Sequence, residues 1–203
     1  MPLIDEPLKA ELRALYRAAD RHYHDLSHIE ALLRLADEHR ADLADREAVE
    51  AAIWFHDAVY DSRRKDNEAR SAAMAAERLG GHVEPARLRD ITRMIEATAG
   101  HEVPTSDRFS AIRDAALFLD MDLAILGASP ADFDSYEAAV RREYGWVADE
   151  DWRAGRGAVL RTFLSRRHIF HTEIFRSAFE AAARENLKRS LARLDPEQPS
   201  APD

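Results

Sequence analysis

The stretch AAIWFHDAVYD, residues 51–61, decides how this chain is interpreted, because it joins an apolar run directly to an adjacent histidine and aspartate. Apolar residues recur at helical spacing ahead of this doublet and predict a buried helix over 49–57. Burying an imidazole beside a carboxylate costs several kcal/mol, roughly, unless both groups find partners. A divalent cation satisfies both groups together. His56 and Asp57 therefore predict a metal-binding pair that needs further ligands elsewhere in the chain.

The segment YHDLSH, residues 23–28, offers ligands of the same kind upstream. It sets His24 and His28 four positions apart, which on a helix places them on one face, one turn from each other. Asp25 is the expected cap of a helix that begins here, because its carboxylate can accept bonds from the unpaired N–H groups of the first turn. A single histidine near an apolar face is usually a satisfied core residue, so the prediction depends on all the segments together.

The segment FLDMDL, residues 118–123, places two carboxylates inside another apolar run. Residues two apart on a helix are rotated by roughly 200°, so Asp120 and Asp122 cannot both face one ion. We therefore expect a cation site at which three separate helices converge.

The order His28, His56-Asp57, Asp122 resembles the HD superfamily of metal-dependent phosphohydrolases, which is named after its central doublet. YHDLSH is similar to the Tyr-His-Asn-x-x-His signature of cyclic-nucleotide phosphodiesterases, a distant branch of that superfamily. Closer similarity is to a bacterial family of predicted HD phosphohydrolases of about this chain's length. The segments that carry it are RHYHDLSHI, AIWFHDAVYD, DNEARSA, FLDMDLAILG and VLRTFLSRRHIF, which span most of residues 21–187.

The resemblance implies an all-α fold, a single compact helical domain of the HD-domain, phosphodiesterase-like type over residues 1–194. It also implies a ligand set of His28, His56, Asp57 and Asp122. Asp122 is preferred because Met-Asp-Leu at 121–123 is similar to the Cys-Asp-Leu run that carries the last phosphodiesterase ligand. Asp120 remains the second choice.

Catalytic roles follow from the same resemblance. Asp57 or Glu68 would orient or deprotonate a metal-activated water, and His24 would protonate the leaving oxygen. For Glu68 the alternative is an ordinary acidic first turn, which suits the helix dipole. His101, after Ala-Thr at 97–98, either lines the pocket or is a surface-loop histidine. Beyond the metal ligands we expect no separate cofactor-binding residues.

Composition limits the chemistry further. The chain has 203 residues, 46% hydrophobic and 33% charged, which is typical of a globular protein. It has no cysteine, so a metal must be held by imidazole and carboxylate. Such ligands suit Mn, Fe, Co, Ni, Mg or Zn. The formal net charge of -9 argues against general nucleic-acid binding but is compatible with a small phosphorylated substrate.

No apolar run approaches the roughly 18 residues of a membrane span, and the N-terminal residues do not resemble a signal peptide. We therefore expect a cytoplasmic protein that does not enter membranes. The sequence indicates no oligomeric state. Residues 195–203 hold three prolines and no apolar period, and we expect a disordered C-terminal tail.

Helical periodicity and helix-ending signals predict helices over the remaining chain. Their expected ranges are 5–19, 26–39, 49–57, 67–79, 85–99, 112–126, 131–147, 152–166 and 172–194. In the last third, Tyr136, Arg156 and Arg167 are either phosphate-binding groups that reach the pocket or, for the arginines, ordinary solvated side chains.

These observations favour a metal-dependent phosphohydrolase that hydrolyses a nucleotide or another small phosphate ester. One alternative is an HD-type di-iron oxygenase, which would need additional histidines such as His82 and His101. A second alternative is a non-catalytic module that binds metal and nucleotide without turnover.

Overall fold

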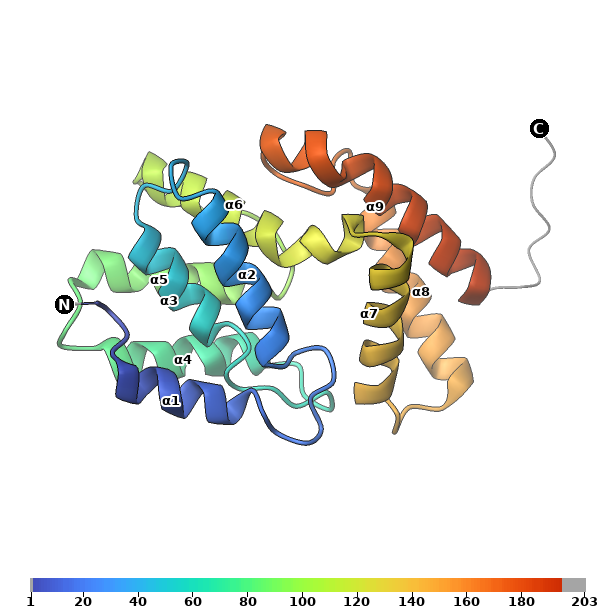
Figure 1. The fold of residues 1–203 in the computed structure, drawn as a ribbon, viewed down its shortest axis with the longest axis horizontal. Helices are drawn as coiled ribbons and strands as arrows, with labels where there is room; N and C mark the ends of the chain where they lie inside the picture. The colour runs from blue at the N-terminus through green and yellow to red at the C-terminus, as the bar shows by residue number, and fades with distance from the viewer. Residues whose placement is uncertain (1, 195–203) are drawn as a thin grey trace. The chain divides into compact units, whose positions relative to one another are not determined.

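The computed structural model describes residues 2–194, and within that range all regular secondary structure is helical (Figure 1). The described residues form nine α-helices and one short 3-10 helix, η1, without any strand, which confirms the predicted all-α class. The elements are α1 (Glu6–Leu15), α2 (Leu26–Glu38), α3 (Arg46–Phe55), α4 (Asn67–Leu79), α5 (Pro85–Ala97), α6 (Phe109–Leu123), η1 (Ala124–Gly127), α7 (Pro130–Glu143), α8 (Asp149–Ser165) and α9 (Glu173–Leu194).

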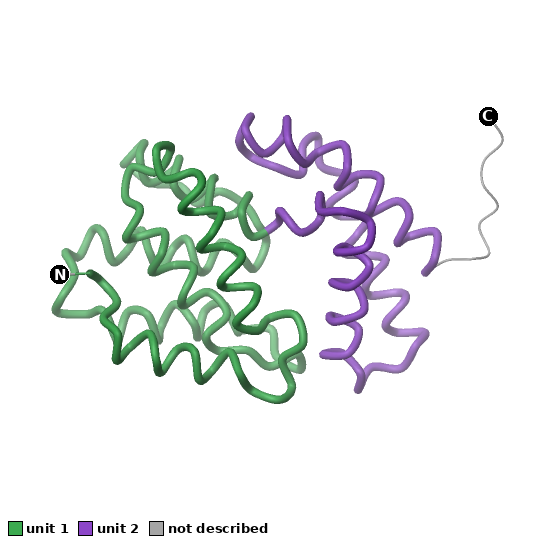
Figure 2. The backbone as a smooth tube through the Cα atoms, in the orientation of Figure 1, with its two compact units in different colours: residues 1–122 green, residues 123–203 purple. Residues whose placement is uncertain are grey.

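Two compact units make up the structure, unit 1 with residues Met1–Asp122 and unit 2 with Leu123–Asp203 (Figure 2). Unit 1 holds α1 to α5 and nearly all of α6, whereas unit 2 holds η1 and α7 to α9. The single domain expected over residues 1–194 stays a prediction. The expected tail, 195–203, lies outside the described residues.

Helix α3 is the centre of unit 1, and it packs against α1, α2, α4 and α5. Its residues 51–55 are all buried, and Ile53 and Phe55 have no exposed surface. Burying a side chain of that size contributes about 1.5–3 kcal/mol. The helix begins at Asp45, whose carboxylate accepts a bond from the Ala48 N–H. The same carboxylate also accepts a bond from the Arg87 guanidinium. The helix that ends at the His56-Asp57 doublet is therefore firmly packed within its unit.

Asp25 caps α2, as the sequence predicts, by accepting bonds from the backbone N–H groups of Ser27 and His28. Its own backbone is extended, so the helix starts at Leu26. His24 therefore lies before the helix, and the predicted placement of His24 and His28 on one helical face is wrong. The physical reason is that a capping residue with non-helical dihedrals separates the two histidines.

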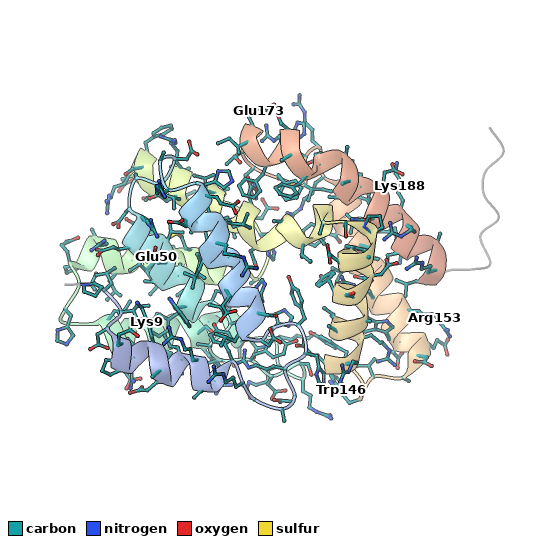
Figure 3. The ribbon with its side chains drawn as sticks, in the orientation of Figure 1. Lys9, Glu50, Trp146, Arg153, Glu173 and Lys188 are labelled. Atoms are coloured by element: carbon teal, nitrogen blue, oxygen red, sulfur yellow. The ribbon has the colours of Figure 1, made fainter. Side chains whose placement is uncertain are left out.

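Unit 2 is built around the close approach of η1 to α9. A Cβ at Gly127 would lie 2.6 Å from the Cβ of Phe179, so only glycine fits at that crossing. The side-chain amide of Asn186 donates to the carbonyls of Leu126 and Ala128, 2.9 Å each, and closes the end of η1. Figure 3 labels exposed residues on the outer sides of α8 and α9: Arg153, Glu173 and Lys188.

None of the helices among the described residues combines the length and the apolar character that crossing a membrane requires.

Candidate metal centre

Four side chains of unit 1 converge at one point. His28 comes from α2, His56 from the C-terminal cap of α3, Asp57 from the next position, and Asp122 from α6. His28 Nε2 lies 3.2 Å from His56 Nε2 and 3.1 Å from Asp122 Oδ1. Asp57 Oδ2 lies 3.0 Å from His56 Nε2 and 3.9 Å from His28 Nε2. The four residues predicted as ligands are thus brought together by three helices.

His28, His56 and Asp122 form a group that could hold a metal ion. Each offers one ligand atom, and these atoms lie within 4.8 Å of one another. Nitrogen and oxygen ligands about 2.0–2.2 Å from a single ion lie roughly 3 Å apart, close to the separations seen here. The donor chemistry and the spacing of these three residues therefore both fit a cation. Asp57 lies at the edge of this group.

The ring of His56 is oriented by its own helix. Its Nδ1 lies 2.9 Å from the Ile53 carbonyl oxygen. Because a carbonyl only accepts, Nδ1 must carry the proton, and a neutral His56 presents the lone pair of Nε2 to the cluster. This is the arrangement that a metal-ligating histidine needs.

Backbone bonds also fix the chain that carries the doublet. The Tyr16 hydroxyl, fully buried, donates to the Trp54 carbonyl at 2.9 Å. The Ala52 and Phe55 carbonyls accept from the N–H groups of His56 and Ala58. The last carbonyls of a helix have no partner within it, so these bonds settle where the helix ends and where His56 and Asp57 point. In the sequence, Tyr16 is marked only by its place in the expected helix 5–19, and nothing there indicates this contact.

The carboxylates of the cluster are ionised at neutral pH. Burial raises the pKa of Asp57, but the neighbouring imidazoles of His56 and His24 outweigh it and hold that pKa well below its usual range. Burial likewise opposes ionisation of Asp122, and hydrogen bonds from His101 and His28 lower its pKa more strongly. Burial lowers the pKa of His56, yet the charge of Asp57 raises it to about 9. The cluster therefore attracts positive charge, as a proton or as a cation.

His101 lines the site and is not a free surface histidine. Its Nε2 lies 2.9 Å from Asp122 Oδ2, while the other oxygen, Oδ1, faces His28. Its backbone has φ of 49°, an uncommon value for a residue other than glycine. His101 therefore orients the Asp122 carboxylate from the side opposite His28.

The two carboxylates of α6 separate as the helical rotation requires. Asp122 joins the cluster, whereas the fully buried Asp120 is outside the metal-binding group. The preference for Asp122 over Asp120 agrees with this geometry.

His24 lies at the edge of the cluster even though it is outside α2. Its ring centroid is 6.2 Å from that of His28, and it stacks on Tyr60 with centroids 4.3 Å apart. The stacking fixes the plane of the imidazole beside the ligands. Its role as a proton donor stays a prediction.

Glu68 lies in the first turn of α4 and is partly exposed. Among the described residues, no hydrogen bond or ion pair joins Glu68 to the cluster, so its catalytic role also stays a prediction. Nearby side chains of α4 instead bind the backbone of the loop that follows the His56-Asp57 doublet. The Asn67 amide bonds both the N–H and the carbonyl of Asp61, and the Ser71 hydroxyl bonds both backbone groups of Val59. Nothing in the sequence pattern indicates that these two side chains anchor the chain that follows the doublet.

The groups considered for phosphate binding in the last third of the chain belong to unit 2. Arg156 is bonded to the Glu137 carboxylate and to the Tyr136 hydroxyl, with only 10% of its side chain exposed. It is therefore neither solvated nor available to a phosphate. Arg167 is exposed, and its carbonyl accepts a bond from Arg184.

No protein-family model, no curated protein and no solved structure matches this chain.

Proposed function

We propose that the protein is an HD-type metal-dependent phosphohydrolase acting on a nucleotide or another small phosphate ester. One observation carries the proposal. Four residues were predicted as ligands from their order in the sequence: His28, His56, Asp57 and Asp122. Each histidine Nε2 lies 3.0–3.9 Å from the carboxylate oxygens of Asp57 and Asp122, and the two Nε2 atoms lie 3.2 Å apart. The resemblance to the HD superfamily rests on those same positions and supports the assignment.

Charge supports a phosphorylated substrate in spite of the negative net charge of the chain. With both histidines neutral, the cluster carries two carboxylate charges, which one divalent cation would cancel. Local field, not total charge, decides whether a small anion can approach. When bound, the cation would supply a more acidic water and polarise a phosphoryl oxygen.

The chain's own residues would do the remaining work. Asp57, at the edge of the ligand group, would orient the water and take up its proton as the P–O ester bond breaks. His24, held in plane by Tyr60, would give its proton to the leaving oxygen. Hydrolysis then adds one water across the bond, and the two side chains exchange their protons with solvent.

The test measures phosphate release from a panel of nucleotides and small phosphate esters by the purified protein with Mn²⁺ or Co²⁺. Asp122→Asn removes a ligand charge, and Asp120→Asn is the matched control on the same helix. Circular dichroism checks that each variant is folded. We expect turnover by the wild type and by Asp120→Asn but not by Asp122→Asn.

Absence of turnover for every ester at saturating metal would overturn the proposal. So would an Asp122→Asn variant as active as the wild type. Binding of metal and nucleotide without hydrolysis would instead identify a non-catalytic binding module.

A further inference from the structure

The guanidinium of Arg21 binds three backbone carbonyls next to the cluster. Nη1 donates to the carbonyls of His24, at 2.8 Å, and Asp57, at 2.7 Å, and Nη2 donates to that of Ala58 at 3.0 Å. Only 8% of the residue is exposed. One side chain therefore ties the segment before α2 to the turn after α3.

Two aromatic rings hold this guanidinium in place. Its central carbon lies 4.9 Å from the ring centroid of Tyr16 and 5.5 Å from that of Tyr60. Tyr16 itself binds the Trp54 carbonyl, and Tyr60 stacks on His24. The arginine is thus enclosed by the same residues that fix the end of α3 and the ring of His24.

We propose that Arg21 is a positioning residue for the cation centre, an inference that rests on the proposed function. The bonds to His24 and Asp57 share one nitrogen, so they set the separation between the two chain segments that supply His24, His28, His56 and Asp57. A cation at the C-terminal end of a helix is also favourable because the helix dipole is negative there.

The geometry calls for a guanidinium specifically. With two nitrogens of its planar fork, Arg21 reaches the adjacent carbonyls of Asp57 and Ala58 and also the carbonyl of His24 on another segment. A lysine ammonium is a compact point charge on a flexible stem and cannot hold this fan of acceptors in one plane. Arg21→Lys should therefore keep the positive charge but only partly maintain the separation of the two chain segments.

Arg87 provides a matched control. Its guanidinium binds Asp45 and Glu47 at the start of α3, the opposite end of the same helix. Replacing it loosens α3 without touching the carbonyls beside the cluster. A purely structural effect of either arginine would lower the melting temperature in both variants and leave the cation geometry alone.

The experiment titrates Co²⁺ into the full-length wild type, Arg21→Met, Arg21→Lys and Arg87→Met at a temperature at which circular dichroism shows every variant folded. The Co²⁺ affinity and the visible Co²⁺ spectrum are both recorded. We expect Arg21→Met to bind Co²⁺ about 10-fold more weakly, the lower end for residues that orient ligands, with a changed spectrum. Arg21→Lys should be intermediate, and Arg87→Met should match the wild type. If Arg21→Met does not fold, Arg21→Lys carries the comparison.

Wild-type affinity and spectrum in the Arg21 variants would overturn the positioning role while leaving the cation centre intact. Equal weakening in Arg87→Met would also overturn it, because general loosening of α3 would then explain the effect. A wild-type protein that binds no Co²⁺ would overturn the cation centre itself and this inference with it.

Discussion

Each unit of the molecule contains ionisable side chains that are buried or largely buried, but their charges are satisfied in opposite ways. In unit 2, Arg156 meets the Glu137 carboxylate and the Tyr136 hydroxyl, and the other Glu137 oxygen accepts a bond from Ser190 at 2.7 Å. One positive and one negative charge cancel. In unit 1, two ionised carboxylates and two imidazoles converge, so negative charge is in excess.

The difference separates a structural network from a binding site. A buried pair that neutralises itself needs nothing from solution and is costly only when it is broken. A group of acceptors with excess negative charge needs a proton or a cation to be stable. The cluster around His56 therefore points to a ligand, and the network around Arg156 does not.

Breaking the unit 2 pair should have the largest effect on stability. Arg156→Met leaves the largely buried Glu137 carboxylate, whose side chain is 17% exposed, without its counter-charge, which should lower the free energy of unfolding by about 3 kcal/mol, the lower end for a buried pair. Urea denaturation measures this loss. Cation affinity should not change, because Arg156 is bonded within unit 2 and is not part of the cluster.

The double variant Arg156→Met/Glu137→Leu is the control. Removing both charges should recover much of the loss, since an apolar replacement of a buried pair is often neutral. A double variant less stable than Arg156→Met would show that the bonds to Tyr136 and Ser190 matter more than the charge pair.

Removing one charge from the cluster should instead change the cation affinity, which the Arg156 variant leaves unaltered. Asp122→Asn keeps the shape of the side chain but withdraws a ligand charge, so Mn²⁺ or Co²⁺ affinity should fall by at least about 100-fold, because loss of a ligand's supporting partner alone costs about 10–100-fold. Isothermal titration calorimetry measures it. Glu137→Gln in unit 2 should leave the affinity unchanged, and equal losses in both variants would contradict the comparison.

The sequence was sufficient to predict the all-α class, the Asp25 cap and the convergence of His28, His56, Asp57 and Asp122. These features depend on local periodicity, or on ligand types whose joint burial needs an explanation. The helix start at Leu26, which places His24 outside α2, also depends on local signals. The expected Asp25 cap and the expected range 26–39 indicated that start, whereas the i, i+4 spacing of the histidines wrongly suggested one helical face.

Other features could not be predicted because they depend on which distant backbone groups meet. Arg21 and Tyr16 bind carbonyls more than 30 residues away, and no periodicity marks a residue for such a role. Asn67 and Ser71 belong to the conspicuous segment DNEARSA, but the acidic Glu68 between them suggested catalysis before loop anchoring. Arg156 resembles a solvated arginine in the sequence, because its pairing with Glu137 depends on the fold.

The excess negative charge in the cluster should also appear as a pH dependence. Cation binding needs neutral His56, whose pKa is raised from 6.5 to about 9, so Mn²⁺ affinity should increase by up to about tenfold per pH unit between pH 6.5 and 8. The stability of the metal-free protein should depend on pH in the opposite direction. The raised pKa contributes stability that is complete below about pH 6.5 and is lost as pH rises through about 9.

Calorimetric titrations at several pH values measure the first effect, and thermal unfolding of the metal-free protein measures the second. Arg156→Met, whose defect lies in unit 2, should show the wild-type pH dependence of affinity. An affinity that stays constant from pH 6.5 to 8 would show that His56 is already neutral in the metal-free protein.

The smallest expected effect concerns the orientation of a ligand and not its charge. His101→Asn removes the bond to Asp122 Oδ2, because the shorter amide cannot span the same distance, while asparagine tolerates the positive φ of this position. Cation affinity should fall by about 10-fold, as for other residues that orient a ligand, with little change in melting temperature. His82→Asn, at an exposed histidine between α4 and α5, is the matched control and should do neither. Because the backbone is preserved, a loss of stability without a loss of affinity in His101→Asn would mean that this histidine supports the loop and not the carboxylate, and the cluster would then hold Asp122 through His28 alone.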